Sequence, residues 1–247
     1  MNDDEFLKHA IMEDDHWWFR ARRELLWQLV ARRIYPLPQR LLEIGCGTGG
    51  NLLFLKNYIP QVTGIDPSPL AARLAQQRTG LDIRHGNFQE IPIHEWQTIE
   101  LVLLADVLEH VENDQAFLYE LWSRMADESY LLLTVPAHSF LWSNHDICLG
   151  HYRRYAPGQL IALFAELPAQ ILVSRPLNTL LFPAIAGYRL LSREKERPAS
   201  QSDFFSMPAW LNTLLWAIFR LEGLWFPLRL LPMGVSHVLL VRKRSTS

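Results

Sequence analysis

Short apolar runs alternate with helical segments along the middle of the chain. Five runs rich in Leu, Ile and Val have the length of β-strands: 40–44, 61–66, 82–86, 99–105 and 130–136. Between them lie segments of helical composition, near 50–57, 68–78 and 113–126. Strands that alternate with helices predict a parallel sheet with helices on both faces. Because β-α-β crossovers are right-handed, we expect this sheet to be doubly wound.

The flanking segments extend this prediction. Residues 5–34 have helical composition, and a proline-containing break at 36–38 ends that pattern. A helix is expected at 158–167, a sixth strand at 170–175 and a last strand from residue 236. About 60 residues separate the last two strands, far more than an ordinary connection. We interpret most of this stretch as a helical insertion.

The expected fold is therefore α/β, with a doubly wound, mostly parallel, seven-stranded sheet of the Rossmann-like kind. Residues 1–38 would form an N-terminal helical extension, residues 39–175 and 233–247 the core, and residues 176–232 the insertion. At 247 residues, the chain has the size of one large domain with such an addition.

Composition narrows the class of protein and of partner. The sequence is 49% hydrophobic with a net charge of -2, which is typical of a globular protein and gives no electrostatic reason to expect nucleic acid as a partner. Cys46 and Cys148 form neither a metal-binding spacing nor a disulfide framework. The N-terminus is not of the signal-peptide type, and the sequence has no uncharged apolar run of about 18 residues. We expect a cytoplasmic protein.

A glycine-rich turn follows the first predicted strand, in "RLLEIGCGTGG". Gly45, Gly47, Gly49 and Gly50 lie within six residues, where the first turn of a doubly wound sheet binds its ligand. Asp66 ends the second strand about 20 residues later, at the place of an acid that accepts hydrogen bonds from ribose hydroxyls. The pattern therefore predicts a cofactor that contains adenosine.

Two classes of cofactor fit the glycines. Gly45, Gly47 and Gly50 satisfy G-x-G-x-x-G, the dinucleotide pattern, whereas Glu43 to Gly49 satisfy E-x-G-x-G-x-G. The second pattern, together with "VTGIDPSP", "GNFQEIP" and "LVLLADVLEHV", resembles the class I S-adenosylmethionine-dependent methyltransferases over residues 40–136. The later segments "GHYRRY" and "LPMGVSHVLLVRK" resemble an uncharacterised bacterial branch of that superfamily, and they name no substrate.

The resemblance implies roles for the residues that match the family's motifs. The glycines of the turn would pass beneath the methionine part of the cofactor, Glu43 would support that loop or the amino group, and Asp66 would bind the ribose. Asn87 and Phe88 would contact the edge and face of the adenine, and Asp106 would lie between cofactor and acceptor. The cofactor-binding residues implied by the resemblance are Glu43, Gly45, Gly47, Gly49, Asp66, Asn87, Phe88 and Asp106.

Candidates for catalysis follow the fourth and fifth strands. A general base helps when a hydroxyl is methylated, and His110 or His145 with Asp146 would suit that task. His110 equally fits a structural role at the start of a helix. The histidines lack usable metal-ligand spacing, so we expect no metal.

Substrate contacts are expected from His151, Arg153 and Arg154, because guanidinium groups bind phosphate or carboxylate bidentately. A solvated basic pair before the next helix is the alternative interpretation of the two arginines.

The insertion raises the question of lipid. Residues 210–225 are apolar on most sides, which is typical of a buried helix or of one in contact with lipid. A helical cap that completes the core is one interpretation, and peripheral membrane contact through 208–232, on the inner face of the membrane, is the other.

The sequence thus predicts methyl transfer from S-adenosylmethionine to an oxygen atom of a small-molecule, glycan or lipid-linked acceptor. The alternatives are an NAD-dependent oxidoreductase and a scaffold that binds the cofactor without catalysis. The sequence indicates no oligomeric state.

Overall fold

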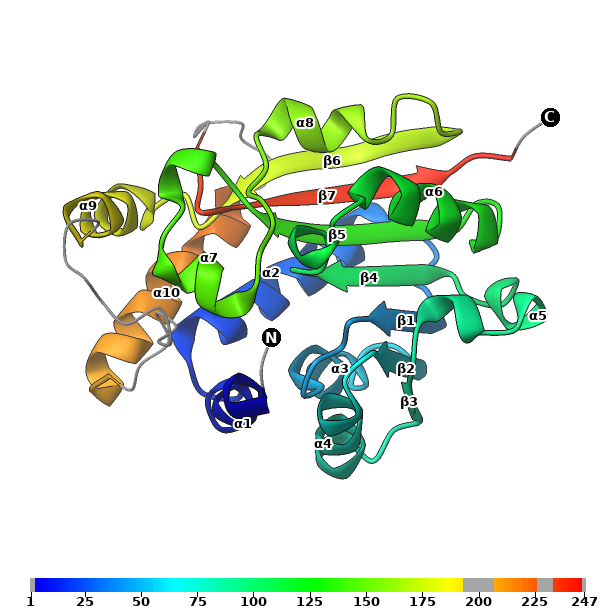
Figure 1. The fold of residues 1–247 in the computed structure, drawn as a ribbon, viewed down its shortest axis with the longest axis horizontal. Helices are drawn as coiled ribbons and strands as arrows, with labels where there is room; N and C mark the ends of the chain where they lie inside the picture. The colour runs from blue at the N-terminus through cyan, green and yellow to red at the C-terminus, as the bar shows by residue number, and fades with distance from the viewer. Residues whose placement is uncertain (1–2, 193–206, 226–232, 246–247) are drawn as a thin grey trace.

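The computed structural model describes residues 3–192, 207–225 and 233–245. One seven-stranded sheet organises these residues, in the order β3-β2-β1-β4-β5-β7-β6. Its strands are β1 (Arg40–Ile44), β2 (Gln61–Asp66), β3 (Ile83–His85), β4 (Leu101–Ala105), β5 (Tyr130–Pro136), β6 (Ala169–Leu177) and β7 (Ser236–Lys243). The first five are parallel to one another, and β7 runs antiparallel between β5 and β6. The predicted doubly wound, mostly parallel sheet is confirmed (Figure 1).

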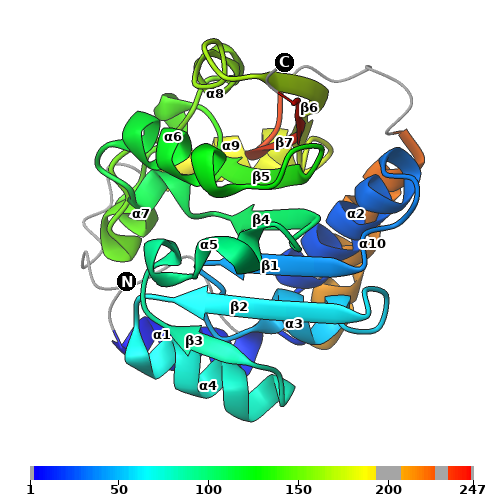
Figure 2. The same cartoon turned by 90° about the vertical axis from the view of Figure 1, so that its right-hand side faces the viewer.

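The helices lie on both faces of the sheet and at its ends (Figures 1 and 2). They are α1 (Asp3–Met12), α2 (Trp17–Arg33), α3 (Gly50–Leu55), α4 (Pro69–Thr79), α5 (Ile93–Trp96), α6 (Asp114–Arg124), α7 (Asn144–Leu149), α8 (Pro157–Ala162), α9 (Phe182–Ser192) and α10 (Ala209–Trp225). Three short 3-10 turns, at Phe88–Glu90, Leu108–His110 and Ser139–Leu141, follow β3, β4 and β5.

The alternation of side chains along the central strands divides the core in two. Leu41 of β1 belongs to a cluster with side chains of α2, α3, α4 and α10, whereas the next residue, Leu42, belongs to one with α5, α6 and α8. Successive residues of a strand point to opposite faces, so continuous apolar runs are what a sheet covered on both sides requires.

The predicted N-terminal helix is divided into α1 and α2. The chain turns at Glu13 to His16, and the His16 side chain accepts a hydrogen bond from the backbone N–H of Trp18 at 3.3 Å, which caps the start of α2. The turn matters for the site, because it brings the end of α1 back to the glycine-rich loop.

Helix α10 of the insertion docks on α2 (Figure 2). Phe219 of α10 is fully buried, with its ring centroid 6.0 Å from that of Trp17 and 5.4 Å from that of Trp18. The side-chain oxygen of Asn212 accepts from the N–H of Trp17 at 2.8 Å, and the Arg220 guanidinium lies 3.1 Å from the Glu24 carboxylate. One face of α10 therefore completes the core.

The outer side of the insertion is different. Leu191 of α9 and Trp210, Leu214 and Leu224 of α10 are exposed, by 83%, 68%, 48% and 67%. Of the segment 208–232 predicted to meet a membrane, residues 226–232 lie outside the described residues. Among the residues that the structure describes, no helix has the length and apolar character needed to cross a membrane.

We expect Phe219→Ala to lower the free energy of unfolding by about 3–4 kcal/mol, because it leaves a cavity between α2 and α10. Chemical denaturation would measure the loss. Leu221→Ala is the matched control: Leu221 is 48% exposed on the same helix, so the expected change is about 0.5 kcal/mol or less. Equal effects of the two substitutions would contradict the docking of α10 through Phe219.

Candidate functional site

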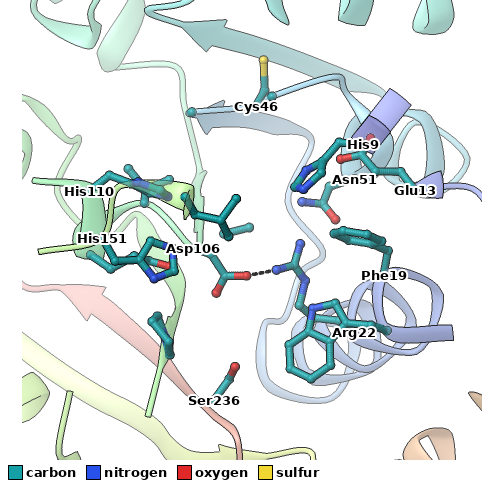
Figure 3. A pocket seen from close by; sticks show the side chains of 18 of the residues that line it. His9, Glu13, Phe19, Arg22, Cys46, Asn51, Asp106, His110, His151 and Ser236 are labelled. Atoms are coloured by element: carbon teal, nitrogen blue, oxygen red, sulfur yellow. Dashed lines mark hydrogen bonds and ion pairs between the residues drawn. The ribbon is translucent and has the colours of Figure 1, made fainter. Parts of the chain in front are cut away.

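A cavity of about 810 Å³ opens at the carboxyl ends of the parallel strands, where ligands bind in doubly wound sheets. The loops after β1, β2, β3 and β4 form one side of it, and α1, α2, α7, α9 and α10 form the other. Figure 3 shows side chains from both sides pointing toward one another. The site is therefore shared between the sheet edge and helices that the sequence assigned to an extension and an insertion.

The glycine-rich loop has the backbone that its sequence predicts. Gly45, Gly47 and Gly49 have φ angles of 69°, 55° and 82°, which L side chains rarely adopt. A Cβ atom on Gly45 would lie 2.8 Å from the Val107 side chain, whereas the space around Gly47 is open. The glycine-rich loop therefore passes close to the loop after β4, and its backbone on the cavity side is free to contact a ligand.

Asp66 fastens this loop and faces the cavity. Its carboxylate accepts from the backbone N–H groups of Gly47 and Ser68, each at 2.8 Å. The group is 4% exposed, and burial raises its pKa despite these two hydrogen bonds. Each carboxylate oxygen retains a lone pair, so the position fits an acceptor for two ribose hydroxyls.

Glu43 lies beneath the loop and is buried. Its Oε1 accepts from the Asn51 amide at 2.7 Å, while Oε2 has no hydrogen-bond partner among the described residues. Burial raises the pKa of Glu43 to about 8, against the effect of the Asn51 hydrogen bond. An unpaired carboxylate oxygen beside the cavity fits a cationic group such as the amino group of S-adenosylmethionine.

Asn87 and Phe88 line the same end of the cavity, after β3. Phe88 is buried edge-on against Phe117, with 5.0 Å between the ring centroids, and offers an apolar wall to a flat ring. S-adenosylmethionine fits these features together. Asp66 offers acceptors for its ribose hydroxyls, and Phe88 offers a wall for its adenine. The open loop at Gly47 and the buried Glu43 carboxyl group fit its methionine part.

The start of α3 argues against a dinucleotide. In dinucleotide sites a pyrophosphate lies at this helix N-terminus. Here the Glu13 carboxylate accepts from the Thr48 hydroxyl at 2.6 Å, the Gly50 N–H at 3.2 Å and the Arg78 guanidinium at 2.8 Å. An anion already caps the helix, so a second anion would be repelled.

Arg22 reaches the centre of the cavity from α2 and pairs with Asp106 (Figure 3). Asp106 has a φ of 59°, unusual for a residue other than glycine, and accepts from the Thr134 hydroxyl at 2.9 Å. Asp106 thus lies in the cavity, as predicted. Sequence reasoning missed Arg22, because "RARR" on a helix is typical of a solvated face.

The predicted residues His145 and Asp146 are neighbours in α7. Asp146 is fully buried and bonds His151, with 2.9 Å between Nδ1 and Oδ1, and it accepts from Arg154 Nε at 2.8 Å. Burial acts to raise the pKa of Asp146, but the His151 hydrogen bond and the Arg154 charge hold it below its usual range. His145 lines the cavity from the same short helix, α7.

The two predicted arginines differ from expectation. Arg153 lies outside the cavity lining and forms an ion pair with Asp114, 3.0 Å away, so its position does not fit contact with an acceptor. Arg154 borders the cavity, but its side chain is 2% exposed and bonds Asp146 and the Ala137 carbonyl. Both guanidinium groups serve the local structure.

His110 and His151 come together on the acceptor side of Asp106 (Figure 3). Their rings meet edge to face, with 4.7 Å between the centroids. Burial and the neighbouring charge of His151 lower the pKa of His110 to about 4, which keeps its imidazole neutral at pH 7. Next to them, Glu109 is fully buried and borders the cavity, a position that the sequence did not single out.

Comparison with known proteins identifies the fold's family. The sequence profile of the methyltransferase-domain family matches residues 16–172, which is more than half of the chain. The chain belongs to this family. Its domain is a methyltransferase domain, and S-adenosylmethionine is its cofactor, which the geometry of the loop and of Asp66 fits.

Individual relatives agree with this assignment. The chain is 27% identical over 126 residues to a probable S-adenosylmethionine-dependent methyltransferase of Mycolicibacterium smegmatis, covering 51% of this chain and 48% of that one. It is 28% identical over 148 residues to the mitochondrial ubiquinone biosynthesis O-methyltransferase of Schizosaccharomyces pombe, covering 56% and 53%. The matches thus span about half the length of these relatives.

Solved structures show the same fold at low identity. A putative methyltransferase in complex with the Haloferax volcanii Trm112 activator superposes with a TM-score of 0.61 and 16% identity, over 99% of this chain and 96% of that one.

We expect Glu43→Gln to stabilise the cofactor-free protein at pH 8 by on the order of 2–4 kcal/mol and to change little at pH 4. The folded protein holds a proton on Glu43 up to about pH 8, whereas the unfolded chain loses it near pH 4.5. Stability therefore falls as the pH rises between these values, and glutamine removes that loss. Urea denaturation at both pH values measures the difference, and an equal effect at pH 4 and 8 would show that ionisation is not the cause.

Proposed function

We propose that this protein transfers the methyl group of S-adenosylmethionine to an oxygen atom of an acceptor. The observation that supports oxygen is the group Glu109, His110 and His151, which borders the cavity beyond Asp106. Hydroxyl groups are poor nucleophiles at neutral pH. They react faster when a positioned side chain accepts the hydroxyl proton. A cluster of a carboxylate and two imidazoles at that place is what O-methylation needs. The similarity to an O-methyltransferase supports the same choice.

The cofactor, when bound, supplies an activated methyl group on a sulfonium. The chain's own residues hold and shield it. Asp66 would bind the ribose hydroxyls, Phe88 the adenine face, and the open backbone at Gly47 the methionine portion. Trp18 and Phe19 border the cavity from α2 and would help to exclude water. Alignment of the acceptor oxygen with the methyl carbon then provides most of the rate gain.

The acceptor side of the cavity has an apolar wall. Ile185 of α9 and Leu215 of α10 line it, and the same two helices expose Leu191 and Trp210 to solvent. An amphipathic acceptor such as a lipid-linked compound fits this arrangement, since its apolar part would contact α9 and α10 while its hydroxyl reaches the polar cluster. We propose that the outer side of the insertion contacts a membrane surface peripherally.

The first test is binding and transfer. Calorimetric titration of the purified chain should show binding of S-adenosylmethionine and S-adenosylhomocysteine but not of NAD. Asp66→Ala should weaken both by about 100-fold, because two charge-assisted hydrogen bonds are lost. Asp82→Ala, an exposed acid after α4, should bind as the original chain does.

Transfer itself is tested with methyl-labelled cofactor and a panel of hydroxylated acceptors, beginning with lipid-linked glycans. Label should appear as a methyl ether. Transfer to nitrogen or carbon would contradict O-methylation, and binding without transfer to any acceptor would favour the scaffold alternative.

Membrane contact has its own test in vesicle flotation. The chain should float with neutral and anionic vesicles, and Leu191→Asp or Trp210→Asp should lower the floating fraction roughly tenfold, because a charge replaces an exposed apolar side chain that would insert into the membrane surface. Ile93→Asp places the same charge at an exposed apolar site on α5 and should have no effect. Absence of flotation with both kinds of vesicle would refute the membrane contact.

A further inference from the structure

Glu109, His110 and His151 form a compact set of donor atoms at the cavity. One atom of each side chain lies within 4.8 Å of the others. Ligand atoms that each lie about 2.1 Å from one metal ion are at most ~4.2 Å from one another. The present separations are at most slightly larger, so small side-chain rotations would place all three atoms around one ion. The 3-10 turn after β4 supplies two of the ligands and the loop after α7 supplies the third. Their spacing in the sequence is irregular, which is why it did not indicate a site.

Glu109 is the most unusual of the three. It is 0% exposed, and within the described ranges neither carboxylate oxygen has a hydrogen-bond partner. The charges of Arg22 and Arg154 act on it, but each of these arginines is already paired with another carboxylate, Asp106 or Asp146. Burial raises the pKa of Glu109, so the group holds a proton unless a cation bound beside it takes the place of that proton.

The histidines are arranged as metal ligands are. His151 bonds Asp146 through Nδ1 at 2.9 Å, which directs the other ring nitrogen, Nε2, toward a different partner. A carboxylate that bonds one nitrogen of an imidazole while the other binds metal is the usual outer support of metal-binding histidines. A hydrogen bond with the Gly150 backbone orients the His110 ring in a similar way. Figure 3 shows both rings beside Asp106, facing the cavity.

From this geometry we infer that Glu109, His110 and His151 bind one divalent transition-metal ion, of the class of zinc, manganese or cobalt. Two imidazoles and one carboxylate favour such ions over magnesium or calcium, which prefer all-oxygen surroundings. Three protein ligands leave coordination positions open toward the cavity, as in catalytic rather than structural sites.

The role of the ion rests on the proposed function. The acceptor hydroxyl would bind at an open position, and the metal would lower the pKa of that hydroxyl so that its proton leaves to water. The oxygen then forms the O–CH₃ bond while the CH₃–S bond breaks, and the electron pair of that bond stays on sulfur. The products are the methyl ether, S-adenosylhomocysteine and one proton.

Direct metal binding tests the site without reference to methyl transfer. Chelator-treated full-length protein is titrated with Zn²⁺ by calorimetry and with Co²⁺ by visible absorption. One ion per chain, with ligand-field bands for Co²⁺, is expected. Glu109→Gln and His151→Ala should each weaken binding by about 100-fold or more, while S-adenosylmethionine binding shows that the variants are folded.

Two controls match these variants. Glu43→Gln removes another fully buried carboxylate that borders the same cavity, and His94→Ala removes an exposed histidine of α5. Both should bind the metal normally. The inferred site would be overturned if the original chain bound no metal. It would also be overturned if Glu109→Gln and His151→Ala bound metal as tightly as the original chain does.

Chelation separates this inference from the proposed function. Once an acceptor is known, removal of metal should abolish transfer, and Zn²⁺, Mn²⁺ or Co²⁺ should restore it. Full transfer by protein shown to be metal-free would overturn the catalytic role of the ion while leaving the methyltransferase function intact. Metal binding without transfer to any acceptor would instead count against the proposed function and leave the site standing.

Discussion

The ion pair between Arg22 and Asp106 holds the functional part of this molecule together. It joins α2 to the carboxyl end of β4 in the middle of the cavity. On one side lie the glycine-rich loop and Asp66, and on the other lie His110 and His151. The Arg22 side chain is buried, at 8% exposed, and Asp106, at 28% exposed, supplies its opposite charge, so the pair favours one arrangement of the N-terminal helices against the sheet edge.

Glu13 makes a second connection between the same two parts. It lies at the end of α1 and accepts hydrogen bonds from the glycine-rich loop and from Arg78 of α4. The N-terminal segment thereby covers the loop that binds the cofactor, and α10 in turn packs behind α2 through Phe219. Helices α1, α2 and α10, which come from the two end portions of the chain, thus cover the cavity. The residues proposed to bind the cofactor and the acceptor hydroxyl come from the strand ends and loops of the central part of the chain.

The buried carboxyl groups at or next to the cavity differ in the number of hydrogen-bond donors they have. Asp66 and Asp146 have two or more donors each, whereas Glu43 and Glu109 keep oxygens that no described residue bonds. Satisfied carboxylates stabilise the local fold, and unsatisfied ones are tolerated where a ligand supplies the missing charge. Both unsatisfied groups border the cavity, Glu43 at the end of β1 before the glycine-rich loop and Glu109 beside His110 and His151.

The sequence by itself determined the strand and helix order, the glycine-rich loop and the position of Asp66 at the end of β2, because apolar periodicity and turn glycines act over a few residues. Only the tertiary structure decided that Arg22 meets Asp106, 84 residues away, that Glu13 caps Gly50, 37 residues away, and that Asp146 bonds both His151 and Arg154. Such contacts depend on which helix faces present their side chains to the cavity. No local sequence pattern predicts which side chains face the cavity, because packing between elements distant in the sequence determines it.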